Sequence, residues 1–197
     1  MKKLIPLLIL LGGAASGFAQ GSVTFRNSVG FTTADPSGGG RLVYELGSPL
    51  DPAVGLGLLG TQYVAELYSG PDASSLTPIV ASISRFRGTT STSKGKWGNS
   101  TLAGLSNDPT TIPGSAPGVP ITLQIKVWDL TTGASFEAAT GKTGTSLPFS
   151  YTPGSPGDPP AKYYMEGLQA FALVPEPSAI ALSVMGIAGL LLIRRRK

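Results

Sequence analysis

Residues 121–129 alternate between two kinds of side chain, and this pattern constrains the fold more than any other feature of the chain. One face of the extended segment would carry Ile121, Leu123, Ile125 and Val127, and the other Thr122, Gln124, Lys126 and Trp128. An alternation of period two is typical of a β-strand that buries one face in a core. We therefore expect the body of the chain, Gln20–Leu173, to be built from strands.

Other short segments rich in β-branched and aromatic residues are also predicted strands. They are Val23–Asn27, Arg41–Leu46, Tyr63–Tyr68, Ile79–Phe86, Ser135–Ala138, Leu147–Tyr151 and Leu168–Leu173. In the first of them, Val23 and Phe25 should face inward and Thr24 and Arg26 outward.

Glycine and proline separate these segments, and the body contains no convincing amphipathic helix. The stretch Gly88–Gly118 is rich in Ser, Thr, Gly and Pro, which favours one long surface loop or partial disorder. Short strands with such turns predict an all-β fold, an antiparallel β-sandwich with a jelly-roll-like arrangement. A β-barrel is the alternative.

The N-terminus has the three parts of a secretory signal peptide. A basic start, Met1–Lys3, is followed by the apolar run Leu4–Leu11 and by a segment of small residues. Gly17 and Ala19 suit signal peptidase, so we expect residues 1–19 to be removed and the mature chain to begin at Gln20. An uncleaved N-terminal anchor is the alternative, and either interpretation exports the body.

The C-terminus carries the apolar run Ala179–Ile193, which contains no charge. As a helix this run would be about 22 Å long, short of the ~30 Å hydrocarbon core, although snorkelling arginines and local thinning can make up the difference. The cations that follow, Arg194, Arg195, Arg196 and Lys197, resist translocation and should remain in the cytoplasm. A transmembrane helix is therefore predicted, with a buried core helix as the alternative.

Val174-Pro175-Glu176-Pro177-Ser178, the apolar run and the basic end together resemble the PEP-CTERM sorting signal of bacterial envelope proteins. The resemblance covers residues 174–197 and implies that an exosortase recognises Pro175, Glu176 and Pro177 as its substrate. It also implies an inner-membrane intermediate, followed by release or transfer to the cell surface or extracellular matrix.

The body is nearly neutral, although the whole chain carries a formal charge of +4. Six of the fifteen basic residues and one of the eleven acidic residues lie in the terminal segments, which leaves nine basic and ten acidic residues in the body. This balance gives no indication of nucleic-acid binding. The chain also lacks cysteine and histidine, which excludes disulfides, Ser-His-Asp hydrolases, papain-like proteases and Cys/His zinc sites. We predict no catalytic residue, metal site or cofactor, with calcium held by loop oxygens of Asp72, Asp108 or Asp158 as the alternative.

Two kinds of side chain remain as candidates for chemistry or binding. A glycosidase-like pair of carboxylates would have to come from Glu45, Glu66, Asp129, Glu137 and Glu166, and the sequence brings no two of them together. Trp128 and Trp97 are candidate ligand-binding residues because an exposed indole can stack on a sugar. The simpler interpretation is that Trp128 packs under a loop or a second sheet.

These observations predict an exported, non-enzymatic envelope or matrix protein. The first alternative is a module that binds extracellular polysaccharide, which requires Trp128 and another exposed aromatic residue on one face. The second is a carboxylate-based glycan-active enzyme, which requires a cleft with two close carboxylates, one of them with a raised pKa.

Overall fold

The computed structural model describes residues 20–27, 41–51, 54–88, 93–102, 109–155 and 164–175, and confirms the all-β prediction there. Elements are given in chain order. They are β1 (Ser22–Val23), β2 (Val43–Tyr44), β3 (Tyr63–Gly70), β4 (Thr77–Phe86), β5 (Trp97–Thr101), β6 (Thr110–Thr111), β7 (Ile121–Asp129), the 3₁₀ helix η3 (Phe136–Ala138), β8 (Lys142–Thr145), β9 (Phe149–Tyr151), β10 (Phe171–Ala172) and β11 (Val174–Pro175).

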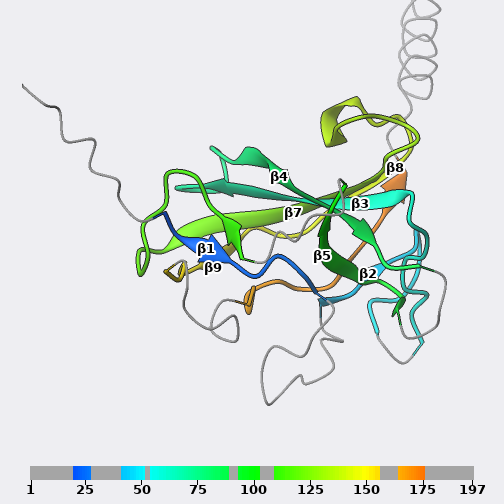
Figure 1. The fold of residues 1–197 in the computed structure, drawn as a ribbon. Helices are drawn as coiled ribbons and strands as arrows, with labels where there is room; N and C mark the ends of the chain where they lie inside the picture. The colour runs from blue at the N-terminus through cyan, green and yellow to red at the C-terminus, as the bar shows by residue number, and fades with distance from the viewer. Residues whose placement is uncertain are drawn as a thin grey trace, which may run out of the picture.

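The main sheet has seven strands in the order β11-β8-β7-β3-β4-β5, with β9 also paired to β7 (Figure 1). Every pairing in it is antiparallel. At its centre β3 and β7 pair over eight consecutive residues, from Tyr63 opposite Asp129 to Gly70 opposite Thr122. This register fixes which side chains become neighbours on each face of the sheet.

Two small sheets cover one face of the main sheet: β1 pairs antiparallel with β6, and β2 pairs in parallel with β10. The main core lies between these layers. From the main sheet it takes Leu67, Ile125 and Val127, and from the small sheets Val23 and Val43. All five side chains are fully buried, as expected for the shared core of two packed layers.

The predicted strands at 63–68, 79–86 and 121–129 are confirmed as β3, β4 and β7. The prediction at 135–138 is wrong. There the chain closes i to i+3 hydrogen bonds, from the Ala138 N–H to the Ser135 carbonyl (3.2 Å) and from the Ala139 N–H to the Phe136 carbonyl (3.3 Å). The resulting 3₁₀ turn places the Phe136 ring against Trp128 instead of extending it along a strand.

The expected loop Gly88–Gly118 is also wrong in part, because it contains β5 and β6. Strand β5 pairs with β4, and its first residue, Trp97, enters the main core. A buried indole supplies enough apolar area to order a segment that is otherwise rich in small polar residues.

The predicted strand 23–27 is regular only at β1, and Thr24 is buried where it was expected to be exposed. The Asn27 side chain explains why the chain leaves the strand. Its amide donates to the Arg41 carbonyl (2.9 Å) and the Gly95 carbonyl (2.8 Å), and its oxygen accepts from the Trp97 N–H (2.8 Å). Both sides of the segment are therefore covered, and the alternation of exposure is lost.

Candidate functional site

The outer face of the main sheet, opposite the core, is partly covered by the connection between β7 and β8. This connection, residues 130–141, packs Phe136 and Ala139 against Trp128 of β7 and Val64 of β3. The rings of Trp128 and Phe136 meet edge to face, with centroids 6.4 Å apart. The Trp128 indole N–H also donates to the Gly133 carbonyl at 2.9 Å, so the connection is fastened by both apolar and polar contacts.

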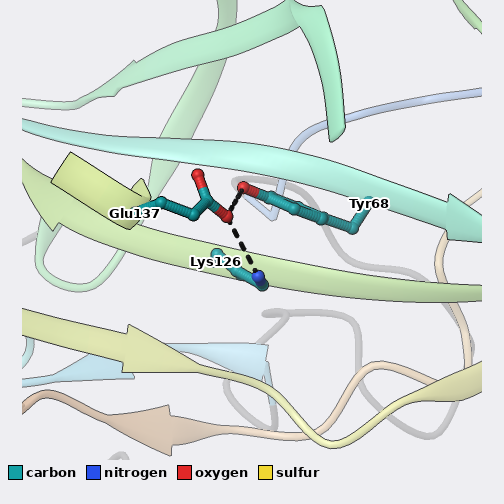
Figure 2. A network of polar contacts seen from close by, with 3 residues as sticks. All are labelled: Tyr68, Lys126 and Glu137. Carbon is teal, nitrogen blue, oxygen red and sulfur yellow. Dashed lines mark hydrogen bonds and ion pairs between the residues drawn. The ribbon is translucent and has the colours of Figure 1, made fainter. Parts of the chain in front are cut away.

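A polar cluster lies beside this apolar patch and consists of Tyr68, Lys126 and Glu137 (Figure 2), together with Glu66. Glu66 and Tyr68 are two residues apart on β3 and therefore share a face. Lys126 lies directly opposite Glu66 on β7, and Glu137 reaches the same place from η3. Residues that are distant in the sequence thus converge at one position on the sheet.

Glu137 is the centre of this polar cluster. Its Oε1 accepts a hydrogen bond from the Tyr68 hydroxyl at 2.7 Å and lies 3.3 Å from the Lys126 ammonium (Figure 2). The Lys126 Nζ also lies 3.9 Å from the centroid of the Tyr68 ring and 4.7 Å from that of Phe136. A cation held over two aromatic faces and against a carboxylate fixes the 130–141 connection onto the sheet.

The pKa values of the two carboxylates of the polar cluster are shifted in opposite directions. Burial raises the pKa of Glu66 above its usual value, and the nearby Glu137 adds to this, while Tyr68 and Lys126 act against it. Burial also acts to raise the pKa of Glu137, but the hydrogen bonds from Tyr68, from its own backbone N–H and from Lys126 outweigh it, so the pKa is lowered. Burial and the bond to Glu137 raise the pKa of the Tyr68 hydroxyl.

One buried acid with a raised pKa beside an ionised carboxylate is the electrostatic arrangement that acid–base catalysis uses. Access differs from that of an active site, because the Glu66 residue is only 2% exposed. The oxygen of Glu137 that faces the sheet is already occupied by Tyr68 and Lys126. As it stands, the polar cluster is arranged to hold a loop.

Two hollows of the described surface lie away from the polar cluster. One, of about 550 Å³, is formed by the β3–β4 turn and residues 113–121, and its lining contains no ionisable side chain. The other, of about 270 Å³, is lined by Ser150–Thr152, Tyr164, Glu166 and Gly167, and so holds one carboxylate. Neither hollow brings two carboxylates together, as glycoside hydrolysis requires.

Both tryptophans predicted as candidate ligand-binding residues are fully buried, at 0% exposure. Trp128 lies under the 130–141 connection, and Trp97 packs against Phe25 and Phe86 in the main core. Neither indole therefore presents an exposed face on which a sugar could stack. The simpler interpretation of Trp128, packing under a loop, agrees with its contacts.

The remaining candidate carboxylates each have contacts of their own, and Glu45 and Asp129 both lie near Tyr63. Glu45 lies 3.9 Å from the Lys142 ammonium, and Asp129 accepts the Thr131 N–H (2.9 Å) and hydroxyl (2.6 Å) within a turn. Glu166 lines the smaller hollow. Among the described residues, no three Asp, Glu, His or Cys side chains gather in a way that could hold a metal ion.

Of the predicted sorting motif, Pro175 is described and belongs to β11, at the edge of the main sheet. Glu176, Pro177 and the membrane stop Arg194, Arg195, Arg196 and Lys197 lie outside the described residues, as do the signal peptide and the apolar run. None of the helices in the described part of the chain has the length and hydropathy needed to cross a bilayer.

Sequence reasoning did not identify Tyr68 and Lys126 as partners of Glu137. The sequence indicated part of this arrangement, because the alternation along residues 121–129 places Lys126 on the same face as Trp128. The register that sets Lys126 against Glu66, and the turn that returns Glu137 to the sheet, have no local signature.

Comparison with protein-family models, with curated proteins and with solved structures found no match.

Proposed function

We propose that this chain is an exported, non-enzymatic protein of the bacterial envelope or extracellular matrix, sorted through its C-terminal PEP-CTERM-like signal. In this proposal signal peptidase removes residues 1–19, residues 20–173 form the ectodomain, and residues 174–197 carry the sorting motif, a transmembrane helix and a basic stop. The observation that carries the proposal is that Gly21 and Val174, next to the two proposed targeting segments, are held in the fold of the body.

The contacts of the body begin immediately after the proposed cleavage site. The Gly21 N–H donates to the Ser115 carbonyl at 3.2 Å, and the Ser22 N–H donates to the Gly154 carbonyl at 3.0 Å. Ser22 and Val23 are buried. Cleavage after Ala19 would therefore leave every one of these contacts in place.

The other end of the body agrees with the proposal. Val174 and Pro175 pair with Thr143 and Lys142 of β8, so the sheet takes up the first two residues of the proposed sorting segment. Both are exposed at the sheet edge. The motif residues Glu176 and Pro177 then follow directly, without a linker between the body and the signal.

We propose that the two layers of the body form a jelly-roll-like sandwich whose role is structural display. A rigid body held by a large apolar core suits a matrix or surface component. The burial of Trp97 and Trp128 removes the main support for a polysaccharide-binding surface. The pair Glu66 and Glu137 favours a glycan-active enzyme as the second candidate, but the burial of Glu66 and the occupied Glu137 weigh against it.

Sorting would proceed from an inner-membrane intermediate whose basic end, Arg194–Lys197, stays in the cytoplasm. An exosortase would then recognise Pro175–Pro177 at the outer face and process the chain. The ectodomain would finally reach the cell surface or the extracellular space.

The test is the intact mass of the protein from fractionated cells, with and without the exosortase. A surface or extracellular form that begins at Gln20, ends near Pro175–Ser178 and requires the enzyme is expected. Glu176→Ala and deletion of Arg194–Lys197 should each impair delivery, whereas the control Glu166→Ala should not. A membrane-bound form that still ends at Lys197 in both strains, or normal delivery of both variants, would refute the sorting proposal.

A further inference from the structure

An apolar loop follows β2 and exposes aliphatic side chains. We call residues 46–51 and 54–56 the leucine loop. Leu46 (41%), Leu50 (52%), Val54 (66%) and Leu56 (62%) are all exposed, whereas Leu58, just beyond the loop, is fully buried. Single exposed aliphatic residues are ordinary on protein surfaces, but four within one short loop form a group that water solvates poorly.

The neck of the leucine loop is closed by backbone hydrogen bonds. The Glu45 N–H donates to the Leu56 carbonyl (2.8 Å), and the Leu58 N–H donates to the Val43 carbonyl (2.8 Å). Inside the loop, the Leu56 N–H donates to the Ser48 hydroxyl oxygen. The aliphatic side chains are therefore presented outward by a folded loop.

The leucine loop lies at the place where the chain leaves the body. The Glu45 carboxylate is 3.9 Å from the Lys142 ammonium, and Lys142 is paired in register with Pro175. The Leu173 N–H also donates to the Tyr44 carbonyl at 3.0 Å. In Figure 1 the loop (cyan) and β11 (orange, beside β8) lie at the same end of the molecule.

The length of chain after Pro175 sets how far this end can lie from a bilayer. Glu176, Pro177 and Ser178 separate Pro175 from Ala179, the start of the apolar run. At ~3.3–3.6 Å per residue, the Cα atoms of Pro175 and Ala179 can be at most about 14 Å apart. The headgroup layer on each side of the hydrocarbon core is itself roughly 5–7 Å thick, so an anchored body must rest on the membrane surface.

We propose that the leucine loop inserts its aliphatic side chains into the interfacial region of the outer leaflet while the chain is anchored by Ala179–Ile193. This inference rests on the proposed membrane-anchored intermediate. The loop contains no basic residue and one acidic residue, Asp51, so the contact is hydrophobic and needs no anionic lipid. It would seat the body in one orientation, with the motif at the membrane surface.

The experiment uses the absence of cysteine, which allows a single introduced thiol to carry an environment-sensitive fluorophore. Val54→Cys places the label on the leucine loop. The matched control, Val119→Cys, replaces another exposed valine (56%) that precedes β7, at the opposite end of the sheet. The full chain is reconstituted in phosphatidylcholine vesicles with a nitroxide lipid, and flotation of the same sample reports anchoring.

The Val54 label should emit at shorter wavelength than the Val119 label, and nitroxide lipid should quench it several-fold more. Quenching should be stronger for a nitroxide near the headgroup end of the acyl chain than near its methyl end, and high salt should leave it unchanged. Equal quenching of the two labels in protein that floats would overturn the inference alone. A blue shift without lipid quenching would mean that protein covers the loop, which also overturns it.

Protein that fails to float with the vesicles would refute the anchored intermediate of the proposed function, and the inference with it.

Discussion

Replacement of Trp128 tests the assignment of this residue to a buried structural role. The indole is fully buried and donates to the Gly133 carbonyl at 2.9 Å. A buried Trp covers roughly 150–250 Å², which at ~25 cal/mol per Å² corresponds to about 4–6 kcal/mol of transfer free energy. Partial collapse of the 130–141 connection should recover some of this, so we expect Trp128→Ala to lower the free energy of unfolding by about 4 kcal/mol.

Trp128→Phe should cost about 1–2 kcal/mol, because the ring survives while the hydrogen bond to Gly133 and part of the area are lost. For a domain of this size about 1 kcal/mol corresponds to roughly 2–4 °C in Tm. Thermal unfolding of the three proteins should therefore give a graded series. A binding residue on an open surface would instead give variants as stable as the parent.

Fluorescence gives an independent assay, because the chain has two tryptophans. Trp97→Phe leaves Trp128 as the one indole, and its emission should be blue-shifted and poorly quenched by acrylamide. Phe136→Ala in that background removes the ring that covers Trp128 and should increase quenching. Emission at the wavelength of a solvated indole, freely quenched before Phe136 is changed, would refute the buried role and restore a surface one.

Four further substitutions have defined outcomes. The pKa of Glu66 is raised in the folded protein, so its contribution to stability is present below the usual value of 4.5 and is lost as the pH rises through the folded-state pKa. Glu66→Gln should therefore flatten the loss of stability at rising pH in unfolding curves measured across pH. The pKa of Glu137 is lowered in the folded protein, so its contribution to stability is present above 4.5 and is lost as the pH falls. Glu137→Gln should therefore flatten the loss of stability at low pH. Unchanged unfolding curves for the two variants would contradict the pKa directions given for Glu66 and Glu137. Asn27→Ala removes three buried hydrogen bonds, to the Arg41 carbonyl, the Gly95 carbonyl and the Trp97 N–H, and should lower the unfolding free energy in urea by about 3 kcal/mol, since each lost bond costs about 0.5–1.5 kcal/mol. Gly21→Ala would place a Cβ in steric conflict with the Pro153 side chain, so it should lower the Tm, and a neutral effect would argue against the docking of Gly21 and Ser22 beside Ser115 and Gly154.

The sequence allowed β7 to be predicted from its alternation of period two, and β3 and β4 from their content of β-branched and aromatic residues. Trp97 was predicted to lie in a surface loop, because its local sequence lacks such a pattern. Its neighbours are Lys, Gly and Asn, and only pairing with β4 and contact with Phe25 and Phe86 make the segment a strand. Tertiary burial overrode local composition there.

The polar cluster could be predicted only in part. The alternation of side chains along β3 and β7 places Glu66, Tyr68 and Lys126 on the faces opposite the core. It does not show that the two strands are neighbours. Tyr68 and Glu137 are 69 residues apart in the chain, and η3 meets the sheet through the packing of Phe136. Contacts of this kind depend on the completed fold.

The two small sheets also limit the order in which the body can be completed as the chain folds. β2, near the start of the body, has as its partner β10, near the end, and the Tyr151 hydroxyl donates to the Ser22 carbonyl across 129 residues of chain. Contacts between distant segments form slowly, because the intervening loop must be closed first. The layer formed by the small sheets therefore stays incomplete until β10 is available, and on the proposed export route the body would need protection from aggregation until its last strands had crossed the membrane.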